Sequence, residues 1–224
     1  MTQTLTNAQM PPRARLNPAA QEAYHGLWAA LFYSGKPIGR TVMFVAAAAG
    51  EGVTTTACGL ALAGSVPAGS SRVALVDFNF RHPDLHEVLG LKAGPGIGEI
   101  LLEDLAPDAA MQPVCQGLDF YPMGRVGQRV GDVLRSQAVV ELLTTLSGGY
   151  DHVLVDVAPV NQYPDAAVLA SIIKDVVLVA QTDQTPREAV WQARKRIEAA
   201  GAKVAGLVMN MRTYPIPAFL YHRV

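Results

Sequence analysis

The chain has 224 residues, of which 50% are hydrophobic and 17% are charged, and its formal net charge is −1. This length and composition suit one globular domain with a sizeable core and leave too little chain for two. The near-neutral charge argues against a nucleic-acid partner. The N-terminal stretch lacks the apolar centre of a secretion signal, and no apolar run reaches the roughly 18–20 residues that cross a bilayer. We therefore expect a cytoplasmic protein.

The order of predicted elements indicates an alternating α/β domain. Residues 1–17 are predicted to form a flexible arm, and Pro18–Tyr33 has the apolar spacing of an amphipathic helix. The predicted strands that follow are Val42–Ala46, Val73–Asp77, Leu118–Tyr121, Val153–Asp156, Val176–Ala180 and Val204–Met209. The predicted helices between them are Thr54–Ala63, Asp132–Leu146, Asp165–Ile173 and Pro186–Ala200, the last with a Thr185 cap and Gly201 after its end.

Most of these strands are apolar on consecutive residues, which is typical of strands buried on both faces of a parallel sheet. Strands separated by helices predict right-handed crossovers. The expected fold is therefore a doubly wound, mostly parallel sheet with helices on both faces, covering residues 18–210, with a tail at 211–224. Cys58 and Cys115 are expected to be reduced core thiols, and His82 and His86 lack a third ligand for a metal.

The stretch GEGVTTTA at Gly50–Ala57 follows the first predicted strand and has the shape of a phosphate-binding loop. Two glycines allow backbone N–H groups to turn toward a phosphate, and the start of a helix adds its positive dipole end. Thr54 stands where the full motif has its Mg²⁺-binding hydroxyl. Val53, however, replaces the lysine of that motif, and Ala47 replaces its first glycine. Taken alone, the loop is equally consistent with a structural turn.

Two aspartates at strand ends favour the phosphate-binding interpretation. Asp77 ends VALVD and Asp156 ends HVLVD, both after apolar runs. A carboxylate at the end of a buried strand is costly unless a cation or hydrogen bonds compensate it. Two of them beside a glycine-rich loop, at the carboxyl edge of a parallel sheet, predict a shared Mg²⁺ site. Asn79 and Arg81 follow Asp77 on alternate positions.

The ordered series GEGVTTTA, VALVDFNFRHPDLHEVLG, GPGIGEIL, YDHVLVDVAPV and GLVMN resembles the cytoplasmic domain of the bacterial tyrosine kinases of exopolysaccharide and capsule synthesis. These are P-loop proteins related to the partitioning and division-site ATPases. The resemblance covers Pro18 to Asn210 and implies ATP or ADP binding with Mg²⁺. It implies nucleotide contacts from Gly50, Glu51, Gly52, Val53, Thr54, Thr55 and Asn210, the last near the adenine. It implies metal contacts from Thr54, Asp77 and Asp156, with Asp77 catalytic if the protein is active.

The resemblance also implies partners. Such proteins work with the cytoplasmic tail of a membrane chain-length or export protein, so peripheral association with the inner membrane is expected. They also form rings, which implies a homo-oligomer or a paralogous partner. In the family, the first helix carries a glutamate and two arginines for subunit contacts. Here the matching residues are Glu22, His25 and Trp28, so both arginines are absent, and core packing alone would account for Trp28.

The remaining departures affect chemistry. Val53 removes the cation that would face the phosphates. Asn79 replaces a carboxylate, and its carbonyl would be a weaker metal ligand. The tail has only Tyr214 and Tyr221 where the family has a tyrosine cluster, and these are equally well explained as phosphoacceptors or as packing groups.

Together these losses predict a pseudokinase that regulates or scaffolds polysaccharide export. A second hypothesis is an active autokinase or slow ATPase that takes its cation from Arg81 or another subunit. A third is a partitioning-type organiser. That class should have a loop lysine or a basic amphipathic C-terminal helix, and this chain has neither.

Overall fold

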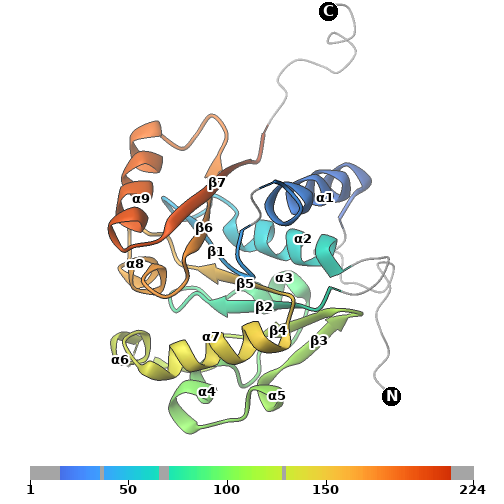
Figure 1. Cartoon of the computed structure of the whole chain (residues 1–224), viewed down its shortest axis with the longest axis vertical. Helices are drawn as coiled ribbons and strands as arrows, with labels where there is room; N and C mark the ends of the chain where they lie inside the picture. The colour runs from blue at the N-terminus through green and yellow to red at the C-terminus, as the bar shows by residue number, and fades with distance from the viewer. Residues whose placement is uncertain (1–15, 36–37, 66–70, 128–129, 213–224) are drawn as a thin grey trace, which may run out of the picture.

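The computed structural model describes residues 16–35, 38–65, 71–127 and 130–212 (Figure 1). Within these ranges one sheet carries helices on both of its faces. The strands are β1 Thr41–Ala46, β2 Val73–Phe78, β3 Gln112–Cys115, β4 Leu118–Tyr121, β5 His152–Val157, β6 Asp175–Gln181 and β7 Lys203–Asn210. The helices are α1 Pro18–Phe32, α2 Val53–Ser65, α3 Leu85–Leu89, α4 Ile97–Glu103, α5 Pro107–Ala110, α6 Val130–Leu134, α7 Gln137–Gly149, α8 Asp165–Ala170 and α9 Arg187–Ala199.

The seven strands have the order β3-β4-β2-β5-β1-β6-β7. All neighbouring pairs are parallel except β3 and β4, which are antiparallel with an irregularity between Pro113 and Cys115. Parallel pairing directs the carboxyl ends of β1, β2 and β5 to one edge of the sheet. The predicted doubly wound, mostly parallel sheet is therefore confirmed.

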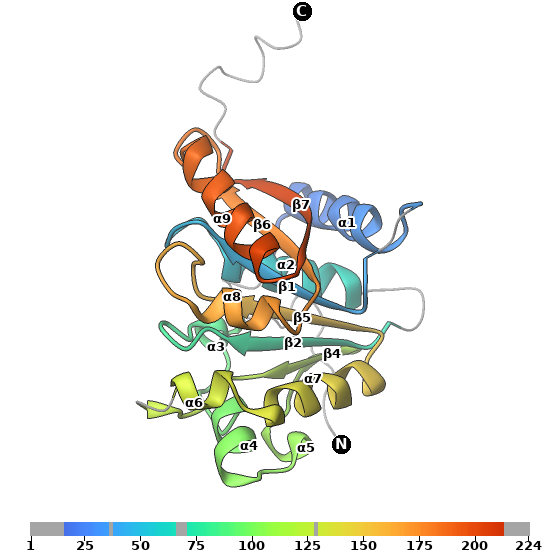
Figure 2. The ribbon, with the colours of Figure 1, turned by 60° about the vertical axis from the view of Figure 1, so that its left-hand side comes forward.

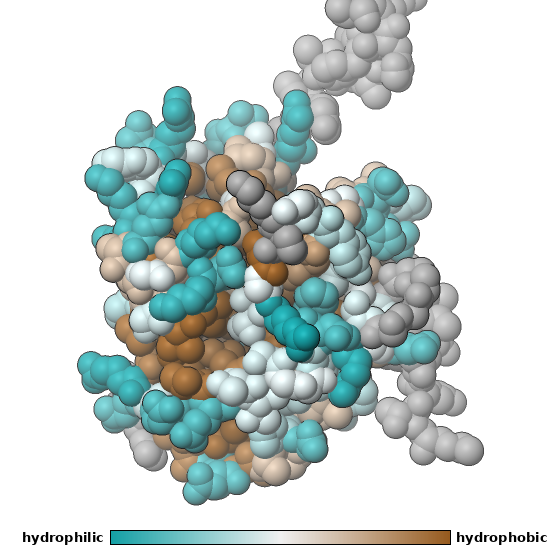
Figure 3. All heavy atoms as spheres, viewed as in Figure 1, coloured by the Kyte–Doolittle hydropathy of each residue, from teal (hydrophilic) through white to brown (hydrophobic). Residues whose placement is uncertain are grey.

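Each face of the sheet carries its own apolar core. On one face, α1, α2 and α3 cover alternate strand residues such as Phe44 and Leu75. On the other, α4, α6, α7, α8 and α9 cover the intervening residues, such as Val45 and Val76. Figure 2 shows these two layers on either side of the strands. In Figure 3, hydrophilic side chains cover α9, whereas hydrophobic ones gather between α8 and α7. Burial on both faces explains why the strands have no polar alternation.

The predicted strands agree with the structure to within one residue at each end, and three short helices and β3 were not predicted. The predicted helix 132–146 is wrong as one element, because α6 ends before α7 begins. Ser136 donates both its N–H and its hydroxyl to the carbonyl of Val133, which closes α6. The predicted Thr185 cap of α9 is also wrong, because that hydroxyl bonds elsewhere, as described below.

Both cysteines are buried and free, as predicted. Among the residues described, no helix combines the length and the apolar character needed to cross a bilayer.

Candidate functional site

The loop between β1 and α2 forms one wall of a pocket of about 370 Å³. Gly50 and Gly52 have φ values of +85° and +83°, in the left-handed region that side chains rarely enter. A Cβ on Gly52 would lie only 2.2 Å from Nδ2 of Asn210, so this position also lacks the space for one. Helix α2 begins at Val53 and its first residues line the pocket. The loop therefore has the backbone geometry of an anion-binding turn at a helix N-terminus.

Glu51 holds this loop together from inside. Its carboxylate is buried, and Oε2 accepts the N–H groups of Ala47 at 2.9 Å and Ala48 at 3.2 Å. Oε1 accepts the hydroxyl of Thr185 at 2.6 Å, and Thr185 Oγ1 in turn accepts the N–H of Gln181. The prediction that Glu51 contacts a nucleotide is therefore corrected as far as its side chain is concerned, because both carboxylate oxygens already bind other groups of the protein. Its main-chain N–H remains a candidate.

Asn210, at the end of β7, also contacts the loop. Its Nδ2 donates to the carbonyl of Glu51 at 3.1 Å. This places Asn210 beside the loop that would hold phosphates, and its predicted role near an adenine stays a prediction. Three separate segments, the loop, the turn before α9 and the end of β7, thus meet at Glu51.

Replacing Glu51 by alanine is expected to destabilise the protein by about 2 kcal/mol, because two loop N–H groups and the Thr185 hydroxyl lose a charged acceptor. Glu51→Gln should cost clearly less, since the amide oxygen still accepts from the loop. Urea denaturation of both variants measures the difference. Equal losses in the two variants would contradict a hydrogen-bonding role for this side chain.

Asp77 and Asp156 lie side by side at the carboxyl edge of the sheet. They are register partners on β2 and β5, and both side chains are buried. Asp77 Oδ1 accepts the N–H of Asn79 at 3.0 Å, whereas Asp77 Oδ2 and both oxygens of Asp156 have no hydrogen-bond partner within the part of the chain that the structure describes. Burial raises the pKa of Asp77 well above its ordinary value, and the charge of Asp156 raises it further. Burial likewise raises the pKa of Asp156 to about 7, although nearby Thr54 lowers it.

Buried carboxylate oxygens without partners are rare, and a bound cation explains them better than a structural role does. The oxygen donors of Asp77, Asp156 and the neighbouring Thr54 hydroxyl are of the type that Mg²⁺ prefers. These residues therefore fit a divalent cation. The structure brings together the three residues predicted as metal ligands, and their actual ligation stays a prediction.

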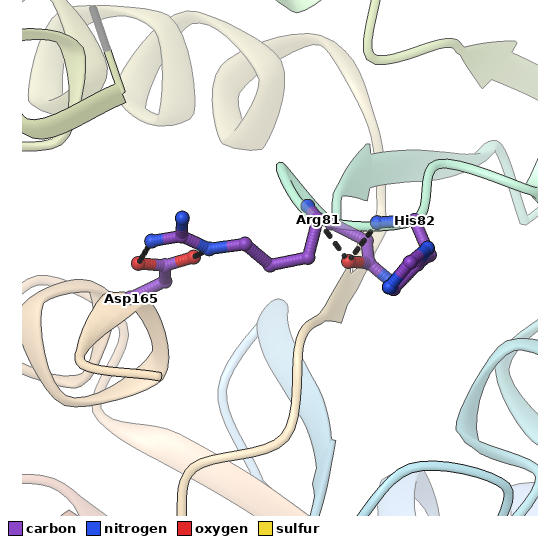
Figure 4. A network of polar contacts seen from close by, with 4 residues as sticks. Arg81, His82 and Asp165 are labelled. Carbon is purple, nitrogen blue, oxygen red and sulfur yellow. Dashed lines mark hydrogen bonds and ion pairs between the residues drawn. The ribbon is translucent and has the colours of Figure 1, made fainter. Parts of the chain in front are cut away.

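Asn79 lines the pocket, but its carbonyl oxygen already has partners in the turn after β2, so its expected role as a weaker metal ligand stays a prediction. Its Oδ1 accepts the N–H groups of Arg81 at 3.2 Å and of His82 at 3.1 Å. Asn79 thus closes the turn after β2, as Asn commonly does. Figure 4 shows this turn and the side chains that leave it.

Arg81 points away from the pocket. Its Nε and one terminal nitrogen donate to the two oxygens of Asp165, at 2.8 and 2.7 Å, and Asp165 is fully buried. The guanidinium also lies 4.7 Å from the ring centre of Tyr163. This bidentate pair ties the turn after β2 to the start of α8. The expectation that Arg81 could replace the loop lysine is therefore wrong, because Asp165 already holds its charge.

Val53 occupies the lysine position without its chemistry. The side chain is 9% exposed and packs into the apolar core beneath α2 while also lining the pocket. Among the described residues that line the pocket, none is a lysine or an arginine. Asp84, Asp156 and His82 line it as well.

On α1, Glu22 and His25 are exposed, whereas Trp28 is buried. The Trp28 ring lies 4.4 Å from that of Phe32 and 4.8 Å from that of His152. Core packing therefore accounts for Trp28, and the prediction that it contacts another subunit at the surface is wrong. An interface through Glu22 and His25 stays a prediction. Tyr214 and Tyr221 lie outside the described residues.

Sequence reasoning missed Asp165, Thr185 and the internal role of Glu51. Asp165 was missed because an aspartate at the start of a predicted helix is common. Its partner Arg81 lies 84 positions away in the chain. A second pocket of about 520 Å³ was also missed. It is lined in part by Pro83, His86, Glu99 and Arg125.

Comparison with known proteins places this arrangement in context. The chain matches none of the models of known protein families. It is 31% identical over 150 residues to EpsB of Ralstonia nicotianae, which carries the name of a tyrosine-protein kinase. The match covers 66% of the chain but only 20% of EpsB, so the chain spans about a fifth of that relative. It is 28% identical to the tyrosine-protein kinase YwqD of Bacillus subtilis, over 76% of the chain and 72% of YwqD.

Solved structures agree on the fold. The kinase domain of the Escherichia coli tyrosine kinase ETK superposes with a TM-score of 0.79 at 23% identity, covering 92% of the chain and 83% of that domain. The septum site-determining protein MinD from Pyrococcus horikoshii, complexed with Mg-ADP, superposes with a TM-score of 0.63 at 20% identity, covering 77% and 70%. The chain is therefore a homologue of the bacterial tyrosine-protein kinases and has the P-loop fold of their kinase domains.

Proposed function

We propose that this protein is a pseudokinase of exopolysaccharide or capsule production, which regulates or scaffolds export without transferring phosphate to tyrosine. Its partner would be the cytoplasmic tail of a membrane chain-length or export protein, which would hold it at the inner membrane. A homo-oligomer or a complex with an active paralogue would serve the same role. ATP or ADP with Mg²⁺ would bind weakly or not at all.

The observation that carries the proposal is the charge of the pocket beside the loop. Val53 stands in the lysine position, Arg81 is engaged by Asp165, and no other described lysine or arginine lines the pocket. A nucleotide would bring about four negative charges next to Asp84 and Asp156. Preorganised cations supply much of the stabilisation of a transferring phosphoryl group, and losing one such contact commonly costs 10²- to 10³-fold in rate.

The loop backbone and the aspartate pair nevertheless keep the geometry of a nucleotide site. A fold that keeps its shape while lacking the charge needed for transfer suits a protein that acts through binding. The relatives named as tyrosine-protein kinases, and the Mg-ADP complex of MinD, support the class of ligand.

The test is Val53→Lys. We expect the wild-type protein to show weak or absent binding of Mg-ATP by calorimetry and no phosphotyrosine after incubation with ATP. Val53→Lys should strengthen Mg-ATP binding by tenfold or more, because the ammonium would face the phosphates across an intact loop. Val53→Met, which has similar bulk and no charge, is the matched control.

Robust autophosphorylation of the wild-type protein that disappears in Asp77→Ala would refute the pseudokinase. That outcome would favour the second candidate, an active autokinase or slow ATPase that receives its cation from another subunit. The observation in favour of this alternative is the aspartate pair, whose unpartnered oxygens still suit Mg²⁺. A partitioning-type organiser has only the shared fold in its favour.

A further inference from the structure

The pocket beside the loop lacks a permanent cation but has one ionisable base. Of the described residues that line it, His82 is the only one whose side chain becomes a cation when it takes up a proton. The side chain is exposed, so a proton can reach it from solvent. The lining also includes the first residues of α2, from which backbone N–H groups would reach a phosphate.

The turn after β2 separates His82 from its neighbour. Because Asn79 Oδ1 accepts the N–H groups of both Arg81 and His82, the turn is closed, and the two side chains leave it in different directions. Figure 4 shows Arg81 extended toward Asp165 and the His82 ring on the opposite side. The ion pair of Arg81 with the buried Asp165 carboxylate holds the arginine away, and of these two residues only the histidine lines the pocket.

We propose that protonated His82 supplies the missing cation of the loop, so that the pocket binds the phosphates of a di- or triphosphate more tightly when this imidazole is charged. The ligand class is a polyphosphate anion, carried by a nucleotide or free. The proposal rests on the phosphate site invoked in the proposed function and adds a regulatory property to it, a dependence of occupancy on pH. In this proposal His82 binds the anion without taking part in a covalent reaction.

Other charged groups face the same pocket and need to be separated from the imidazole. Glu51, Asp84 and Asp156 line it, and Asp77 lies beside Asp156. The Glu51 carboxylate is held by loop N–H groups and by Thr185. All four acids are unchanged when His82 alone is substituted, and the titration of the ligand is the same for every variant. A ratio of affinities between wild type and variant therefore isolates the histidine.

The experiment measures binding of inorganic pyrophosphate, without divalent cations, by calorimetry at pH 8.0 and pH 5.5. The wild-type affinity divided by that of His82→Gln should be near 1 at pH 8.0 and about fivefold at pH 5.5, the effect of one hydrogen bond to a charged group. His86→Gln is the matched control. His86 is four residues away and lines the neighbouring pocket, so its ratio should stay near 1 at both values. A parallel measurement with ADP in place of pyrophosphate shows whether the adenosine part of the nucleotide adds affinity.

A His82→Gln ratio that does not change with pH would overturn the proposal, and so would a wild-type protein that binds no pyrophosphate at pH 5.5. Val53→Lys then tells what has failed. If this variant binds at pH 8.0, the pocket is intact and His82 is simply not its cation. If it does not, the pocket itself has been lost. The pseudokinase proposal fails separately, through autophosphorylation of the wild-type protein.

Discussion

Replacing Arg81 by methionine is expected to lower the free energy of unfolding by about 3 kcal/mol, because it leaves the Asp165 carboxylate buried without a partner. Asp165 is 0% exposed, and both of its oxygens accept from the Arg81 guanidinium. Methionine keeps the length and the apolar stem but none of the donors. Urea denaturation at pH 7 measures the loss.

Two comparisons make this result specific. Arg194→Met removes an arginine from an exposed pair with Glu198 on α9, which should cost less than about 0.5 kcal/mol. The double variant Arg81→Met with Asp165→Leu should recover most of the loss, since an apolar pair can replace a buried ion pair. If Arg81→Met cost no more than Arg194→Met, the carboxylate of Asp165 would have to be protonated or hydrated in the folded protein.

Replacing Asp156 by asparagine is expected to stabilise the protein at pH 8 in the absence of divalent cations, by about 2–3 kcal/mol. The folded-state pKa of Asp156 is about 7, compared with an ordinary value of 3.8. Each pH unit of difference corresponds to about 1.4 kcal/mol, and water entering the open pocket reduces the full effect. Asparagine removes the buried charge beside Asp77. Thermal denaturation should show a midpoint raised by about 5 °C or more.

The pH dependence has a definite sign. A carboxyl group whose pKa is raised on folding contributes stability below its unfolded pKa and loses that contribution as the pH rises through its folded pKa. The gain from Asp156→Asn should therefore be small at pH 4–5, where the wild-type group is protonated, and large above pH 7. Burial lowers the pKa of His152, so its contribution is lost in the opposite direction, as the pH falls below about 6.5. Both proteins share that term, and their difference excludes it.

Millimolar Mg²⁺ provides the functional half of this test. At pH 8 it should raise the melting temperature of the wild-type protein and leave that of Asp156→Asn unchanged, because a bound ion stabilises only the folded state that holds it. Asp132→Asn, an exposed substitution on α6, is the control for charge alone and should keep the wild-type response. A destabilised Asp156→Asn at pH 8 would show that the carboxylate already has a partner in the apo protein.

Much of the site was predictable because it depends on periodicity along single strands. Asp77 and Asp156 each end an apolar run, and parallel pairing brings such ends to one edge, where the structure places them in register. The glycine spacing likewise predicted a phosphate loop. The predicted helix 132–146 merged part of α6 with α7, since the hydrogen bonds of Ser136 that end α6 depend on a local turn that an apolar pattern does not reveal.

The layered fold, the loop and the absence of the loop lysine could all be predicted from residues that lie close together in the chain. Tertiary structure decided which neighbouring groups serve the pocket. Arg81 and His82 are adjacent in the chain. The buried carboxylate of Asp165, 84 positions from Arg81, binds the arginine, whereas His82 lines the pocket. Thr185 and Trp28 likewise contact partners that are distant in the chain, Glu51 and His152. A side chain takes the partner that satisfies it after burial, and long-range packing brings that partner within reach.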